Sequence, residues 1–169
     1  MDIIARAAIL GLCLVPRPTI AAGLSGTPEV IDGDTIIVAG ETVRLFGVDA
    51  PEPGQLCAIG ARTYDCGAVA RTALLDLSAG TPVTCELVTN AGSEGEHEGK
   101  PARCFAAGYD LSEGMAYTGW ALAQRDITGH YVSFETGAHK AKRGLWKGKF
   151  LPPWAWRDGE RLPQEINAQ

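Results

Sequence analysis

The chain has 169 residues and a formal net charge of −5, with 46% hydrophobic and 21% charged residues. This length can bury a core as one domain, and the apolar content excludes a disordered or coiled-coil protein. The 21 glycines and 10 prolines favour short strands and turns over a helical bundle. An acidic chain is a poor match to a nucleic-acid binder, unless its charge is unevenly placed or a cation occupies its site.

Residues 1–22 read as a signal peptide. Residues 7–15 form an apolar run that is too short to span a bilayer but suits the core of a signal peptide, and Ala22 offers a cleavage position. The alternative is a cytoplasmic chain with an apolar first strand. We expect a secreted or periplasmic protein, a monomer without stable membrane insertion.

The cysteines support export. Without Cys13 four remain, an even number that allows three pairings. A zinc site is the competing interpretation, but no histidine stands at a zinc-ligand spacing. Two disulfides formed in an oxidising compartment therefore account better for Cys57, Cys66, Cys85 and Cys104.

The first predicted element is a β-hairpin. Residues 35–38 are rich in β-branched side chains, residues 39–41 form a turn, and residues 42–48 form the returning strand. Residues 49–54 must then be a loop, because two prolines and a glycine cannot continue a ladder.

The order of the later elements favours a mainly β α+β fold with a small antiparallel barrel. Helices are predicted at 68–77, at 111–118 with Asp110 or Ser112 as cap, and at 134–143 between Ser133 and Gly144. The other predicted segments are strands at 82–88 and 102–107, an acidic glycine-rich loop at 90–99, an irregular segment at 151–157 and a frayed polar end.

The hairpin gathers carboxylates at one end of the sheet. Asp32 and Asp34 are two residues apart, so an extended backbone points both to one face. Asp49 and Glu52 follow the returning strand, which ends beside the start of the first. Because like charges repel, a hard divalent cation would relieve the cluster, and calcium is the natural choice. The plain alternatives are a turn at 32–34 and a loop at 49–52.

Arg44 lies five residues before Asp49 on the same predicted strand. A guanidinium beside carboxylates and a metal suits the clamping of a phosphate. The alternative is a surface salt bridge.

Residues 30–35 (Val-Ile-Asp-Gly-Asp-Thr) and 43–52 (Val-Arg-Leu-Phe-Gly-Val-Asp-Ala-Pro-Glu) carry a resemblance. Together they resemble the signature of the staphylococcal-nuclease-like (thermonuclease) family, in its exported, disulfide-containing bacterial form. The resemblance continues at 102–105, 119–123 and 144–146 and covers roughly residues 27 to 157.

The resemblance implies a five-stranded OB-fold barrel with three helices over residues 23–157, followed by a polar tail at 158–169. The implied activity is calcium-dependent hydrolysis of phosphodiesters in DNA or RNA. It further implies the disulfides Cys57–Cys66 and Cys85–Cys104.

The resemblance also assigns metal ligands. Asp34 and Asp49 would bind calcium through their carboxylates, and Ala50 through its backbone carbonyl. Asp32 would lie just outside these ligands.

For the chemical step, the resemblance assigns Glu52 to position or deprotonate the attacking water and Arg44 to hold the phosphate. The family's second phosphate-binding arginine is not in its usual place, where Gly99 or Lys100 stands. Lys100 would supply the charge but not the bidentate fork of an arginine.

This departure keeps a second hypothesis open: an OB-fold module that binds nucleic acid or nucleotides with weak or no catalysis. A third is a structural envelope protein whose Trp154 and Trp156 dock on a partner. The cations of residues 140–149 either attract a phosphate backbone or form a solvated helix face.

Overall fold

The computed structural model describes residues 23–89 and 99–163. The predicted signal peptide, residues 90–98 of the predicted loop and residues 164–169 of the tail lie outside the described residues. Among the described helices, none has the length and apolar character needed to cross a membrane.

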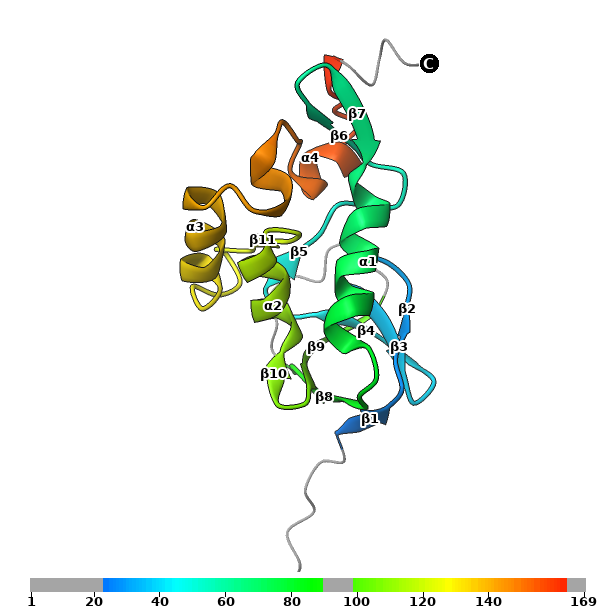
Figure 1. Ribbon diagram of the computed structural model, residues 1–169. Coiled ribbons are helices and arrows are strands. Elements are labelled where there is room, and N and C mark those ends of the chain that lie inside the picture. Colours follow the sequence, from blue (N-terminus) through cyan, green and yellow to red (C-terminus); the bar gives the residue numbers. More distant parts are fainter. Residues whose placement is uncertain (1–22, 90–98, 164–169) are drawn as a thin grey trace, which may run out of the picture.

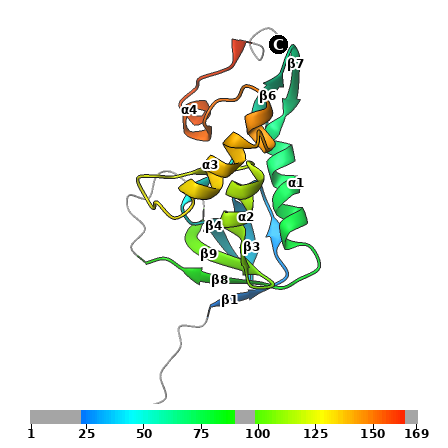
Figure 2. The same ribbon diagram turned by 60° about the vertical axis from the view of Figure 1, so that its left-hand side comes forward.

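The fold is mixed α+β, as predicted, and is built on short strands. One sheet runs in the order β1-β8-β9-β4-β3-β2, with β10 beside β9, and it curls strongly into a half-barrel (Figures 1 and 2). Only the β4–β9 pair within this sheet is parallel. Its strands are β1 (Leu24–Gly26), β2 (Glu29–Val30), β3 (Thr35–Val38), β4 (Glu41–Leu45), β8 (Val83–Leu87), β9 (Lys100–Ala106) and β10 (Tyr109–Asp110).

Two small ribbons complete the described β-structure. β5 (Val48–Asp49) pairs with β11 (Leu122–Ala123), and β6 (Leu56–Ile59) pairs with β7 (Arg62–Asp65). Sequence reasoning did not predict the β6–β7 hairpin, which lies beyond the end of helix α1 farthest from β1 and β8 (Figure 1).

The predicted hairpin of β3 and β4 is confirmed, with Thr35 opposite Arg44 and Val38 opposite Glu41. The prediction that its second strand continues to residue 48 is wrong. β4 ends at Leu45, and Gly47 turns the chain with a φ of 75° before β5 begins. A side chain at Gly47 would collide with the ring of Tyr131, which is fully buried there.

The helices are α1 (Cys66–Ser78), α2 (Leu111–Thr118), α3 (Val132–Lys140) and α4 (Pro153–Arg157), with a short 3₁₀ turn η1 (Gly144–Lys147). α2 has the predicted bounds. The Asp110 side chain accepts hydrogen bonds from the amides of Ser112 and Glu113, and Gly119 ends the helix in the left-handed region.

Three predictions for the C-terminal part are wrong. α3 begins and ends earlier than predicted, and Tyr131, not Ser133, precedes it. The segment after residue 151 is partly helical, because a proline at the first helical position loses no hydrogen bond. The chain beyond Arg157 is not frayed as far as it is described, since Leu162 is buried.

The core lies between the curled sheet and helices α1 and α2, around fully buried Ile36, Val43, Leu45 and Leu74. Both predicted disulfides are present. Cys85–Cys104 joins directly opposed residues of β8 and β9, and Cys57–Cys66 joins β6 to the first residue of α1.

Two glycines let α1 approach the loop that follows β5. A Cβ on Gly33 would lie 2.6 Å from the Cβ of Ala50 and 2.8 Å from that of Ala70. A Cβ on Gly67 would overlap the carbonyl of Glu52. Close packing of α1 therefore fixes the 32–34 turn and the 50–52 loop against each other.

We expect Gly33→Ala to destabilise the protein by about 1–3 kcal/mol, the usual cost of overpacking. Gly129→Ala is the matched control, because a Cβ there meets nothing within 4 Å. Urea unfolding of both variants measures the difference. Equal free energies of unfolding for the two variants would contradict this packing.

Candidate functional site

A cavity of about 460 Å³ opens beside the β3–β4 hairpin and the loop after β5. It collects charge of both signs from four parts of the chain. The charged residues that line it are Asp32, Asp34, Arg44, Asp49, Glu52 and Arg157. The structure thus brings together five of the residues singled out from the sequence and adds Arg157.

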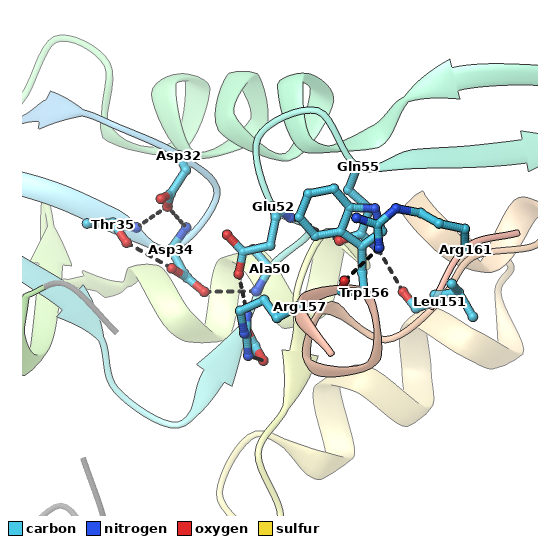
Figure 3. Close-up of polar contacts among 11 residues, drawn as sticks. Asp32, Asp34, Thr35, Ala50, Glu52, Gln55, Leu151, Trp156, Arg157 and Arg161 are labelled. Atoms are coloured by element: carbon cyan, nitrogen blue, oxygen red, sulfur yellow. Dashed lines mark hydrogen bonds and ion pairs between the residues drawn. The ribbon is translucent and has the colours of Figure 1, made fainter. Parts of the chain in front are cut away.

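Asp32 shapes the turn before β3. Its Oδ1 accepts hydrogen bonds from the amides of Asp34, at 3.0 Å, and Thr35, at 2.7 Å. These bonds are an Asx-type turn, so the plain interpretation of residues 32–34 holds. Asp34, which follows in this turn, lines the cavity, and its carboxylate points toward Ala50 (Figure 3).

Asp34 is the most perturbed carboxyl group of the cavity. Only 7% of the residue is exposed. Burial, followed by repulsion from Asp32 and Asp49, raises its pKa from 3.8 to about 8. Its Oδ1 accepts the hydroxyl proton of Thr35 at 3.0 Å, and its Oδ2 accepts the amide proton of Ala50 at 2.9 Å.

Ala50 thus touches the site through its N–H group, whereas the resemblance implies a role for its carbonyl. The N–H bond ties the start of β3 to the loop after β5, across 16 residues of sequence. Ala50 itself is buried.

Arg157, at the C-terminal end of α4, holds two carboxylates (Figure 3). Its Nη1 and Nη2 donate to the two oxygens of Asp49, at 3.0 and 2.7 Å, in a bidentate pair. Its Nη1 also pairs with Glu52. Asp49 is almost fully buried, so this guanidinium balances a charge that water does not reach.

The contact between Arg157 and Glu52 affects the pKa of each group. Burial opposes the charge on Arg157, but the hydrogen bonds and charges of Asp49 and Glu52 outweigh it and raise its pKa. Burial raises the pKa of Glu52, while the hydrogen bond and charge of Arg157 oppose that rise. Arg157 is therefore always protonated, and Glu52 is a stronger base than an exposed glutamate.

Arg44 enters the cavity from β4. Its Nη1 is buried and has no hydrogen-bond partner among the described residues. No salt bridge to Arg44 occurs within residues 23–89 and 99–163, contrary to the surface salt-bridge interpretation. A buried donor without a partner is costly, which suits a ligand that supplies the acceptor.

Lys100 does not join the site, contrary to the sequence-based expectation. Its Nζ pairs with the Glu41 carboxylate at 2.6 Å, its side chain is 59% exposed, and it does not line the cavity. Gly99 lies against the backbone of Arg44 with a φ of 103°, a conformation that disfavours any side chain there.

The cations of residues 140–149 also lie away from the cavity lining. All four lysines of this run are exposed, as expected of a solvated face. Arg143 stacks on the ring of Tyr117, with 4.1 Å from its Cζ to the ring centroid.

Sequence reasoning missed Arg157 because it took residues 151–157 as irregular. The signal that could have found it is Pro152-Pro153 ahead of Trp-Ala-Trp-Arg, since a proline pair often starts a helix. The length of that helix then decides where the arginine lies.

Within the described part of the chain, no group of three or more His, Cys, Asp or Glu side chains is arranged to hold a metal ion. The donor chemistry of the cavity nevertheless suits a hard cation, because its carboxylates are oxygen donors. Burial, and after it the charges of Asp32 and Asp49, raise the pKa of Asp34 more than the Ala50 amide and the charge of Arg44 lower it.

Comparison with known proteins places the chain in a family. No model of a known protein family matches the chain. The chain is 37% identical over 150 residues to the succinoglycan biosynthesis protein ExoI of Rhizobium meliloti (strain 1021), covering 84% of this chain and 75% of that protein. The chain belongs to the same family as ExoI.

When a chelator keeps metal ions away from the protein, we expect its stability to fall as the pH rises. The pKa of Asp34 is higher in the folded state than its ordinary value of 3.8, so the folded protein binds the extra proton. Its contribution is complete below about pH 4 and is lost as the pH rises toward 8.

Melting temperatures in EDTA at pH 5 and pH 8 measure this loss, with Asp34→Asn as the comparison. The variant should lose less stability than the wild type over this interval. Parallel pH profiles for the two proteins would contradict the assignment of the raised pKa to Asp34.

Proposed function

We propose that this protein is a calcium-dependent phosphodiesterase that hydrolyses DNA or RNA, of the staphylococcal-nuclease-like type. The observation that carries the proposal is the cavity itself. Asp34, Asp49 and Glu52 line it with their carboxylates, and so does Arg44, whose buried Nη1 has no described partner. Carboxylates for a cation and a guanidinium for an anion are the pair of functions that phosphodiester hydrolysis needs.

The curled sheet supports the assignment of this chain to the OB-fold. We propose that β1–β4, β8 and β9 form an OB-type barrel, with the cavity at one side of its β3–β4 hairpin. The two disulfides suit an oxidising compartment, and with the predicted signal peptide they support secretion or periplasmic export.

Asp34, Asp49 and the carbonyl of Ala50 would hold the calcium ion, which when bound supplies Lewis-acid polarisation of a phosphoryl oxygen. Calcium accepts six to eight oxygen ligands in flexible geometry, which tolerates a site partly shared with Arg157. Asp32 holds the turn that presents Asp34.

Arg44 would donate from Nη1 to a non-bridging phosphate oxygen and stabilise the charge that grows there during attack. Glu52 would take a proton from, or orient, the attacking water. Its raised pKa brings it closer to the working pH, where a general base is most effective.

Two alternative functions are each favoured by one observation. The exposure of Lys100 and its pairing with Glu41 favour a binding module without efficient turnover. The name of ExoI favours a role in polysaccharide synthesis, where the same groups would act on the phosphate linkage of a nucleotide-activated sugar.

The direct test is cleavage of labelled DNA and RNA by the purified protein with calcium or with EGTA. We expect cleavage with calcium alone. Glu52→Gln and Asp34→Asn should each lower kcat/KM by about 10²–10⁴-fold, the usual range for a general base or a charge-stabilising group. Asp76→Asn, on the exposed face of α1, is the control and should retain full activity.

Equal cleavage with and without calcium, or full activity of Glu52→Gln, would reject this mechanism. Calcium-dependent binding without cleavage would favour the binding module. Turnover of a nucleoside-diphosphate sugar with intact DNA and RNA would favour the polysaccharide role.

A further inference from the structure

Resting on the proposed function, we infer that Arg157 is a further catalytic residue: the second guanidinium that contacts the substrate phosphate, contributed by the C-terminal segment. Arg157 would thus act as the second phosphate-binding cation, the role that the sequence suggests for Lys100. The inference starts from position, because Arg44 on β4 and Arg157 on α4 are the two arginines that line the cavity.

The charge of the cavity calls for this second cation. Four carboxylates and two guanidinium groups line it, so the described lining is acidic even with both arginines. A phosphodiester is an anion, and its hydrolysis adds negative charge to the phosphoryl oxygens. The charges of a calcium ion and Arg44 together would not neutralise the four carboxylates. The positive charge of Arg157 makes the two signs equal.

The guanidinium of Arg157 has more hydrogen-bond donors than its carboxylate partners use. It carries five N–H groups. The structure gives three hydrogen bonds, from Nη1 and Nη2 to Asp49 and Glu52. Two N–H groups thus have no partner among the described residues, and the carboxylates hold the planar fork in place for a bidentate contact.

The fold fixes Arg157 in this place. The buried Gln55 receives the Glu52 amide on its Oε1 at 3.0 Å and donates from Nε2 to the carbonyl of Leu151 at 2.9 Å (Figure 3). One side chain therefore links the loop that carries Glu52 to the segment that carries Arg157.

The chain that follows α4 folds back on it. The guanidinium of Arg161 lies over the Trp156 ring, with 4.2 Å from Cζ to the centroid, and donates to the Trp156 carbonyl at 2.8 Å. Pro153 and Leu162 are buried on either side of Arg157 in sequence. The segment is fixed before α4 by Gln55, and the side chain is fixed by Asp49, so Arg157 is pre-organised and the cost of using it is lower.

The test compares three variants, Arg157→Lys, Arg157→Ala and Lys100→Ala, in calcium-dependent cleavage of a fluorescent single-stranded DNA. We expect Arg157→Lys and Arg157→Ala to lower kcat by about 10²–10³-fold, as for loss of a charge-stabilising donor. Lys100→Ala should stay within threefold of wild type. Added guanidinium chloride at low millimolar concentration should restore part of the kcat of Arg157→Ala, which a purely structural loss would not allow.

A measurement on the wild type keeps the inference testable if Arg157→Ala fails to fold. Labelling by phenylglyoxal, read by mass spectrometry, should slow at Arg44 and Arg157 when oligonucleotide and calcium are added, but not at Arg161. Unchanged labelling of Arg157 beside a protected Arg44, or kcat values of both Arg157 variants within threefold of wild type, would overturn the inference and leave the nuclease standing. A wild type that neither binds nor cleaves the oligonucleotide would overturn both.

Discussion

Burial of several carboxylates around one cavity is the constraint on which the site depends. Asp34 and Asp49 are nearly inaccessible, and a buried carboxylate without a partner is strongly destabilising. The protein meets this constraint in two ways. A proton or backbone amide stabilises Asp34, and the guanidinium of Arg157 stabilises Asp49. In the function that we propose, a divalent cation would join or replace these partners, so stability and ligand binding would depend on the same groups.

Much of the site could be predicted from the sequence, because it depends on local geometry. The β-branched run at Thr35–Val38 and the turn after it fix a hairpin, and a hairpin must bring its two ends together. That register places Asp34 beside the end of β4, and the short turn at Gly47 then brings Asp49 on β5 to it. The break at Gly47 was missed because it depends on the buried ring of Tyr131, which comes from a distant part of the chain.

The C-terminal segment shows where local reasoning fails. Two prolines and a polar end indicate irregular chain, yet tertiary contacts of Leu151 with Gln55 and of Arg157 with Asp49 accompany a short helix there. Such contacts leave no periodic signal in a five-residue element. Lys100 shows the reverse error: its charge suited the site, but its partner Glu41 lies on the neighbouring strand and holds it away. The place of a cation therefore depends on packing that its own neighbours in sequence do not reveal.

The similarity to ExoI covers most of both chains and shows that the two proteins belong to one family. If the cavity binds a cation next to an anionic substrate, as we propose, calorimetric titration with calcium should detect the cation. We expect saturable binding of one calcium ion per chain, strongly weakened in Asp34→Asn and unchanged in Asp76→Asn. Absence of saturable binding to the wild type, or equal affinity of Asp34→Asn, would contradict it.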